Sequence, residues 1–559
     1  MPLLLVTLEG VLRWGGYGYE TALVVKDATG ENFHENDKFL WRFFSPQTKL
    51  QPHPFLVPVR KEPDTLRIVV LGESAALGTP EPAYGFWRML ERQLRRDFPG
   101  RKFEVINAAM RGINSHVILP IAKECVRLQP DLFVIYMGNN EVVGLHAPGP
   151  ETHLSNLTLL RAIDWVKGTR CGQLLLAAAS KWVKTELAEN QDMAFFRAHR
   201  LAADDPRRLA VYRNFESNLR DICTVVTNSG AHVLLCTIPV NLRDCAPLGS
   251  LHRAGFSTED QAACDAEISK ANGADGVKHL EAALARDDHY AEWHYRLAEM
   301  LSGDPARQLR EYQLARDWDA LQFRADAPIN DAIRKTAAEM RLPLVDAEKK
   351  FAENLPGREL FYEHVHLRFA GDHLLAQNIY PAVIAELGLK PGSNVPPVFT
   401  SREELAQRLG FTSLNEFQIE FSISQLLGTP PFLDQFEHAT RLQAYRQAFT
   451  NKFILRTPAD VQRDLDRYRS AIGEATNDWH LHVNLGDIYT TLQKPPPAIE
   501  QYQMANRLMP HYQPARLKLA RAQARAGRAH EAQDTIEEGL KIDPKSPLLQ
   551  AALSQVQGR

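Results

Sequence analysis

The stretch Leu66–Gly78 constrains the fold of this 559-residue chain more than any other feature. It opens with an apolar, largely β-branched run, Ile68–Leu71, which is typical of a strand buried on both faces of a sheet. The run stops at Gly72-Glu73-Ser74, and a helical pattern follows. A strand that ends in this way places the Ser74 hydroxyl at the carboxyl edge of a parallel sheet, where open α/β folds bind their ligands.

Strands and helices alternate beyond this point. Five segments have the pattern of strands: Arg67–Leu71, Phe103–Asn107, Leu132–Met137, His232–Ile238 and Pro343–Val345. The helical segments between them are Tyr84–Phe98, Ser115–Leu128 and Arg208–Asn228. This alternation predicts a parallel sheet with helices on both faces, spanning residues 66–390. Residues 151–206 and 248–320 interrupt the series and are expected to be helical insertions.

The flanking regions differ from the sheet domain. Residues 1–65 are expected to be an N-terminal lead-in that is irregular over residues 14–65, and residues 391–477 a helical linker. Residues 478–559 contain a tetratricopeptide pattern, in which seven positions recur after 34 residues. The two sets are Leu485, Gly486, Tyr489, Ala498, Tyr502, Ala505 and Pro510, and Leu519, Ala520, Gln523, Ala532, Ile536, Gly539 and Pro544. The segment His289–Tyr312 resembles a degenerate third unit, although an ordinary helical hairpin has the same pattern.

Three further features of the sequence argue against particular classes of protein. They are the net charge, the spacing of the cysteines and the N-terminal segment. A net charge of −3 without a basic block argues against a nucleic-acid binder. The six cysteines form no Cys-x-x-Cys pair, which argues against a zinc ribbon and favours buried free thiols, with a Cys236–Cys245 bridge left open. Pro2–Leu12 is apolar, but Glu9 interrupts it and it falls short of the roughly 20 residues of a membrane span. The sequence leaves open whether the N-terminal segment lies close to a membrane.

Four short blocks each follow a predicted strand. They are Gly72-Glu73-Ser74, Asn107–Gly112, Gly138–Glu141 and Glu363–His366. Taken singly, they would be a helix N-cap, a strand cap, a turn, and either a solvated helix start or half a metal site. Four such blocks in this order, each just past a strand, are better explained as one site.

The blocks supply the parts that acyl transfer requires. Ser74 is a weak nucleophile that needs a base, and His366 can act as that base. Glu363 precedes His366 by three residues, so a helical turn would let its carboxylate orient the imidazole. The backbone N–H groups of Ser74 and Gly112 and the side-chain amide of Asn140 can stabilise the oxyanion.

The order and spacing of the blocks resemble the SGNH (GDSL-like) hydrolase family, and in particular its bacterial subgroup with tetratricopeptide repeats. The resemblance implies a flavodoxin-like three-layer α/β sandwich with helical insertions and an all-α C-terminal region. It makes Ser74 the nucleophile, Gly112 and Asn140 the oxyanion residues, and His366 the base. Glu363 stands where the family usually has an aspartate.

Two further glutamates, Glu73 and Glu141, also replace aspartates of the family, and both are expected to lie outside the reacting set. His364, His373 and Arg111 are given no role. Neither a cofactor nor a catalytic metal is expected, because the four blocks already account for His366.

The expected activity is that of a serine esterase acting on an ester or acylated glycan. Two alternatives stay open: an O-acyltransferase or deacetylase acting on a glycan, and a non-catalytic tetratricopeptide scaffold with a vestigial hydrolase fold. The repeats are expected to bind a protein partner, and no nucleic-acid partner is expected. The resemblance suggests an extracytoplasmic, membrane-associated location, whereas the chain as written has the character of a soluble protein.

Overall fold

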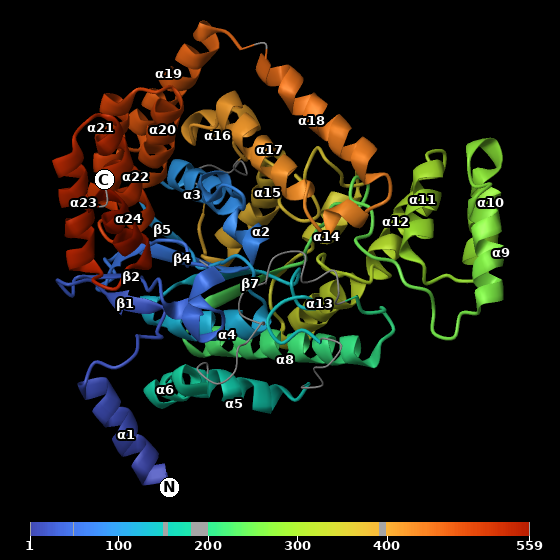
Figure 1. Cartoon of the computed structure of the whole chain (residues 1–559), viewed down its shortest axis with the longest axis horizontal. Helices are drawn as coiled ribbons and strands as arrows, with labels where there is room; N and C mark the ends of the chain where they lie inside the picture. The colour runs from blue at the N-terminus through green and yellow to red at the C-terminus, as the bar shows by residue number, and fades with distance from the viewer. Residues whose placement is uncertain are drawn as a thin grey trace.

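A five-stranded parallel sheet forms the centre of the molecule, as Figure 1 shows. The computed structural model describes residues 2–48, 50–148, 155–179, 200–390, 398–454 and 456–557. The strand order is β5-β4-β6-β7-β8, and every neighbouring pair is parallel. This is the flavodoxin-like order, so the predicted fold class is confirmed. The strands are β4 (Thr65–Gly72), β5 (Lys102–Asn107), β6 (Leu132–Tyr136), β7 (His232–Cys236) and β8 (Leu344–Val345).

The register brings the ends of the three first strands to one edge. Val70 of β4 lies opposite Asn107 of β5, and Gly72 of β4 lies opposite Tyr136 of β6. The apolar run of β4 is fully buried, as a strand covered on both faces must be. The first three blocks therefore emerge from neighbouring strands at the carboxyl edge of the sheet.

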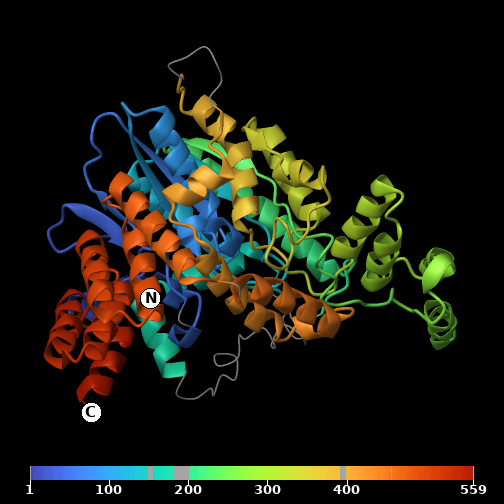
Figure 2. The same ribbon diagram turned by 90° about the horizontal axis from the view of Figure 1, so that it is seen from above.

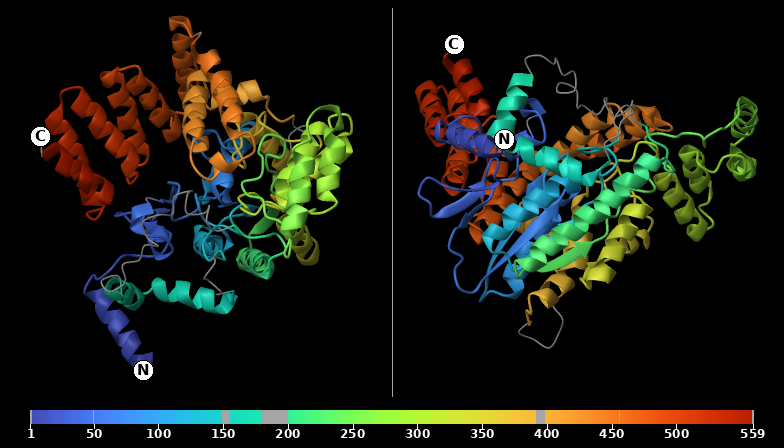
Figure 3. Two further views of the ribbon diagram at one scale, coloured as in Figure 1. Left: turned by 45° about the vertical axis from the view of Figure 1, so that its right-hand side comes forward. Right: turned by 90° about the horizontal axis from the view of Figure 1, so that it is seen from below.

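Helices cover both faces of the sheet (Figures 1 and 3). One layer contains α3 (Phe86–Asp97) and α15 (Phe369–Glu386), which pack against each other. The opposite layer contains α4 (Ser115–Cys125), α8 (Pro206–Asn228) and α13 (Ala327–Met340). The short α14 (Ala347–Ala352) follows β8. The three predicted helices thus exist, and none of their ends differs from the prediction by more than three residues.

The N-terminal region is more regular than expected. After α1 (Pro2–Trp14), it forms a three-stranded antiparallel sheet of β1 (Val24–Lys26), β2 (Asn32–Glu35) and β3 (Leu56–Pro58). The expectation of an irregular lead-in was therefore wrong. Strands of three or four residues are too short for an alternating pattern to stand out. Across the described residues, no helix combines the length and the apolar character of a membrane span.

Two groups of helices branch from the sheet domain. The first contains α5 (Leu157–Lys167) and α6 (Arg170–Ala179), while residues 151–154 and 180–199 of this predicted insertion lie outside the described part of the chain. The second contains α9 (Thr258–Ile268), α10 (Gly276–Leu284), α11 (Ala291–Met300) and α12 (Pro305–Asp317). Figure 2 shows it far from the C-terminal helices, so the α11–α12 pair does not stack on the repeats.

The described residues that follow the sheet domain are mainly helical. The region after the sheet domain forms α16 (Arg402–Arg408), α17 (Ser413–Leu427), α18 (His438–Ile454) and α19 (Pro458–Glu474). The repeats form two helix pairs and a final helix: α20 (Trp479–Thr491), α21 (Pro495–Leu508), α22 (Gln513–Arg525), α23 (Ala529–Ile542) and α24 (Pro547–Gln557). The two predicted repeat units are therefore present, and α24 follows them. All six cysteines are free, so Cys236 and Cys245 form no bridge.

Candidate active site

Ser74 begins the short helix α2 (Ser74–Leu77), directly after β4. Glu73 is the extended residue before this helix, and its carbonyl oxygen accepts a hydrogen bond from the Leu77 N–H at 2.9 Å. The Thr79 N–H donates to the Ser74 carbonyl oxygen at 3.0 Å, which closes the turn. Ser74 is partly exposed in an otherwise buried segment. Its position at the carboxyl edge of the sheet agrees with the prediction.

Glu73 joins the first and third blocks. Its carboxylate accepts hydrogen bonds from the backbone N–H groups of Asn139, at 2.7 Å, and Asn140, at 3.3 Å. Burial, followed by the nearby charge of Glu141, raises the pKa of Glu73 to about 8. The sequence analysis assigned no function to Glu73. In the structure, its hydrogen bonds hold the third block in place.

Glu141 anchors the same block from the other side. Its two carboxylate oxygens accept hydrogen bonds from the Ser115 N–H, at 2.8 Å, and the Ser115 hydroxyl, at 2.7 Å. Asn218 of α8 then donates to the Ser115 hydroxyl oxygen at 2.9 Å. Burial raises the pKa of Glu141 to about 7. The third block is therefore tied to the starts of α2 and α4 by buried carboxylates.

Asn140 links the third block to the second. Its side-chain Nδ2 donates to the Ile113 carbonyl oxygen at 2.9 Å. The neighbouring Gly112 has a φ of +68°, a conformation that glycine adopts at little cost. The two predicted oxyanion residues are thus in adjacent, directly bonded loops.

Asn107 bonds the end of the short helix α2, which is more than the strand cap first considered. Its Nδ2 donates to the carbonyl oxygens of Ala76 and Leu77, both at 3.2 Å, and its Oδ1 accepts from the Ala109 N–H at 3.0 Å. One buried amide therefore fixes both the end of α2 and the start of the second block.

The fourth block is a tight loop and not a helical turn, which corrects the expected geometry. The Tyr362 N–H donates to the His366 carbonyl oxygen at 2.8 Å, and Phe361 pairs with Leu367 in an isolated antiparallel bridge. Within this loop, Glu363 Oε1 still contacts His366 Nδ1, while Glu363 Oε2 accepts from the Val365 N–H at 3.0 Å. The close approach of Glu363 to His366 therefore comes from loop geometry.

His364 shares the same carboxylate. Its Nδ1 lies against Glu363 Oε2, and its ring packs against Phe323 and Phe432. Burial acts to raise the pKa of Glu363, but His364 and His366 together lower it well below its usual value. His364, which the sequence left without a role, thus helps to keep Glu363 ionised.

The outer nitrogen of His366 is buried and free of hydrogen bonds. In the described part of the chain, Nε2 has no hydrogen-bond partner, so a bond between His366 and the Ser74 hydroxyl is not formed in this structure. Such bonds often tighten only when substrate binds. The structure therefore joins Glu363 to His366, and Asn140 to the Gly112 loop, but leaves Ser74 and His366 unbonded.

The loop after β7 supports the histidine loop. Asn241 Nδ2 donates to the Glu363 carbonyl oxygen at 2.7 Å, and the Asn241 N–H donates to the His364 carbonyl oxygen at 2.9 Å. Sequence reasoning missed this residue, because a single asparagine in a loop carries no distinguishing pattern. It gives the fourth block a rigid connection to the sheet.

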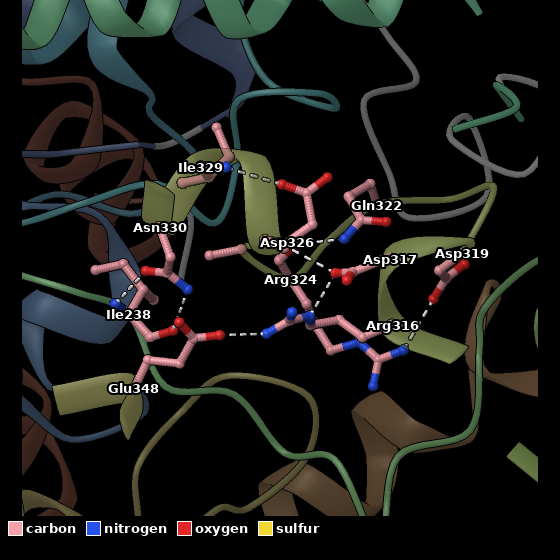
Figure 4. Close-up of polar contacts among 12 residues, drawn as sticks. Ile238, Arg316, Asp317, Asp319, Gln322, Arg324, Asp326, Ile329, Asn330 and Glu348 are labelled. Carbon is pink, nitrogen blue, oxygen red and sulfur yellow. Dashed lines mark hydrogen bonds and ion pairs between the residues drawn. The ribbon is translucent and has the colours of Figure 1, made fainter. Parts of the chain in front are cut away.

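A buried polar network at the start of α13 stiffens the same region (Figure 4). Asn330 forms two hydrogen bonds with the backbone of Ile238, just after β7. Its Oδ1 accepts from the Ile238 N–H at 2.7 Å, and its Nδ2 donates to the Ile238 carbonyl oxygen at 3.1 Å. Asp326 caps the helix by accepting from the Ile329 N–H. The Ala325 N–H donates to Asn139 Oδ1 at 3.0 Å. The network therefore reaches the third block directly.

Comparisons with known proteins agree with the two-part architecture. The family model described as Tetratricopeptide repeat matches residues 493–556, and no curated protein matches the chain. A solved lipase/acylhydrolase from Enterococcus faecalis is 15% identical, covering 59% of this chain and 99% of that chain, with a TM-score of 0.27. Axe2, an acetylxylan esterase from Geobacillus stearothermophilus, is 12% identical, covering 58% and 95%, with a TM-score of 0.27.

The repeat region also has a solved counterpart. The second tetratricopeptide domain of the human RPAP3 protein, solved with an HSP70 peptide, is 22% identical, covering 18% of this chain and 84% of that chain, with a TM-score of 0.17. The C-terminal region is a tetratricopeptide repeat region. The sheet order and its helical layers are those of the flavodoxin-like sandwich that the resemblance to SGNH hydrolases implied.

Proposed function

We propose that this protein is a serine esterase that cleaves carboxylic esters, with Ser74 as nucleophile and His366 as base. The observation that carries the proposal is the Glu363–His366 contact, which occupies Nδ1, while the buried Nε2 has no hydrogen-bond partner among the residues that the structure describes. A histidine held in this way by a carboxylate can accept the proton of a serine hydroxyl. Ser74 supports the proposal because it begins a helix at the ligand-binding edge of the sheet.

The reaction follows the acyl-enzyme route. The Ser74 hydroxyl oxygen attacks the ester carbonyl carbon while His366 Nε2 takes the hydroxyl proton. The bond to the leaving alcohol then breaks, and His366 gives that proton to the alcohol oxygen. Water attacks the acyl-Ser74 ester with His366 again as base, and the carboxylic acid leaves as Ser74 regains its proton.

The oxyanion is stabilised by donors from three blocks. These are the backbone N–H groups of Ser74 and Gly112 and the side-chain amide of Asn140. The Asn140 amide has two N–H bonds, of which one is directed to the Ile113 carbonyl oxygen, so the other is available for a substrate oxygen.

A fluorophosphonate probe tests the nucleophile. We expect it to label the purified protein at Ser74, as mapped by mass spectrometry, and to label Ser74→Ala at background level. His366→Ala should lower turnover of a short-chain chromogenic ester by about 10³-fold or more while the circular dichroism spectrum is kept.

His232 offers a matched control for the base. It also pairs with a glutamate, Glu386, at 3.0 Å, but it stands at the first residue of β7, the opposite end of the strand from the site. His232→Ala should keep wild-type turnover. Labelling at a different serine, or full turnover by a folded His366→Ala protein, would show that the assignment is wrong.

A further inference from the structure

Two histidines and a glutamate meet where the N-terminal sheet touches the repeats. His34 and Glu35 end strand β2, and His511 lies in the turn between α21 and α22. The Nε2 of His511 is 3.0 Å from Glu35 Oε2, and the rings of His34 and His511 are 4.6 Å apart between centroids. One potential ligand atom from each residue lies within 4.8 Å of the other two.

Hydrogen bonds already orient two of these side chains. The Nδ1 of His34 lies 2.7 Å from the Glu35 carbonyl oxygen, so Nδ1 carries the proton and Nε2 keeps its lone pair. Glu35 Oε2 also accepts from the Phe55 N–H at 2.8 Å. Metal-binding histidines and carboxylates are usually held by such secondary hydrogen bonds.

The charges at this joint favour a cation. Glu35 is only 3% exposed, and its carboxylate lies 3.0 Å from Nε2 of His511. The nearby Lys38 is already paired with Asp543 at 2.7 Å. A buried carboxylate is costly unless a positive charge compensates it. A divalent ion would compensate Glu35 and would also use the lone pairs of both imidazoles.

We propose that His34, Glu35 and His511 bind a zinc ion that fastens the N-terminal sheet to the tetratricopeptide repeats. Two imidazole nitrogens and one carboxylate oxygen are a typical ligand set for zinc. Tetrahedral bonds of about 2.0–2.2 Å separate neighbouring ligand atoms by roughly 3.3 Å, so the His511–Glu35 pair needs to open only slightly. A water molecule would complete the shell. The site is separate from the blocks that contain Ser74 and His366.

Zinc titration of the whole chain tests the site. Tag-free protein is stripped with a chelator and titrated with zinc chloride by calorimetry, and with cobalt(II) by visible absorption. We expect one tightly bound equivalent, d–d bands of a four-coordinate cobalt site, and a higher melting temperature with zinc because the ion binds only the folded state.

Substitutions distinguish zinc binding at this site from zinc binding elsewhere on the protein. His34→Ala keeps the Glu35–His511 contact but removes a ligand, so it should lose the cobalt bands and the zinc-dependent rise in melting temperature. His511→Ala should do the same. The matched control is His279→Ala, because His279 pairs with Glu267 at 2.7 Å without a second histidine. This control should bind zinc as the wild type does.

Two outcomes would overturn the proposal. One is a wild-type protein that shows neither cobalt bands nor a zinc-dependent melting shift. The other is a His34→Ala protein that keeps both, since the metal would then be held elsewhere. The cobalt spectrum of the wild type decides the first outcome even where a variant fails to fold.

Discussion

The carboxylates of Glu73 and Glu141 are both buried beside the third block, and each holds part of that block through hydrogen bonds. Burial and mutual repulsion raise the pKa of Glu73 to about 8, and burial raises that of Glu141 to about 7. Both groups therefore hold protons in the folded protein at pH values where the unfolded chain has released them. Stability gained from this protonation is lost as the pH rises through the folded pKa values.

Unfolding free energy should therefore fall between about pH 5 and about pH 8. Glu141→Gln removes one of the two groups and also the charge that raises the pKa of Glu73, so the fall should become smaller. Urea unfolding at several pH values measures this fall in the free energy of unfolding. Glu353→Gln, at an exposed position paired with Lys350, should follow the wild-type curve. Equal pH dependence in Glu141→Gln and the wild type would contradict the prediction.

Substitution of the two neighbouring asparagines should have different effects: one should lower catalytic turnover and the other should lower stability. Asn140→Ala removes an oxyanion donor and should lower kcat about 10²–10³-fold, or about 3–4 kcal/mol, with little change in KM. Asn139→Ala removes the bond to the Ala325 N–H and should instead cost about 1–3 kcal/mol of stability, with a much smaller change in kcat. Steady-state kinetics and urea unfolding of both variants test this. Reversed effects would mean that the oxyanion register is wrong by one residue.

Among the elements, the repeat helices depend on small residues at their contacts. A Cβ on Gly486 of α20 would lie 2.5 Å from the Tyr502 ring of α21, which packs against it. Gly473, near the end of α19, has open space where its Cβ would stand. These two helical glycines therefore differ in packing and not in backbone conformation.

Gly486→Ala should destabilise the first repeat, by about 1–3 kcal/mol, because the new methyl group pushes the α20 and α21 helices apart. Gly473→Ala should be neutral or should stabilise by up to about 1 kcal/mol, because alanine is the better helix former. Thermal unfolding followed by circular dichroism compares them. A Gly486→Ala protein as stable as Gly473→Ala would show that the helix contact is looser than described.

For the whole molecule, the repeats are docked on the sheet domain and are not a detached tail. Asp478, which caps α20, forms ion pairs with Arg88 and Arg92 of α3, and all three side chains are largely buried. Tyr84 also bonds Tyr468 at 2.7 Å and accepts from Asn484 at 3.1 Å. Helix α3 and the turn before it are therefore held in place by contacts with the C-terminal third of the chain.

Asp478→Asn should cost about 3–5 kcal/mol, because Arg92 loses its buried counter-charge and Arg88 keeps only its pair with Glu91. Although burial opposes it, Arg88, His480 and Arg92 lower the pKa of Asp478 well below its usual value. Its contribution should therefore be present above about pH 4 and be lost as the pH falls.

Urea unfolding at pH 7 and at lower pH measures both effects. Asp466→Asn breaks an exposed pair with Arg469 and should change stability by less than about 1 kcal/mol. An Asp478→Asn protein as stable as this control would contradict the buried ion pair.

The sequence by itself determined the parallel sheet and the repeats. A fully buried β4 needs an unbroken apolar run, and packed repeat helices need small residues at a fixed period, so both leave local patterns. It also predicted that the first three blocks follow strands that end at one edge, whereas α14 separates the fourth block from β8. Whether Ser74, Gly112, Asn140 and His366 act as assigned stays a prediction.

Only the tertiary structure decided what holds these blocks. The bonds of Glu73 to the third block and of Asn241 to the histidine loop join residues more than 60 positions apart. The short strands β1–β3 likewise owe their pairing to each other and not to a strong local pattern. Contacts of this kind depend on how loops meet once the sheet has formed, and a buried carboxylate or amide looks the same in sequence as a solvated one.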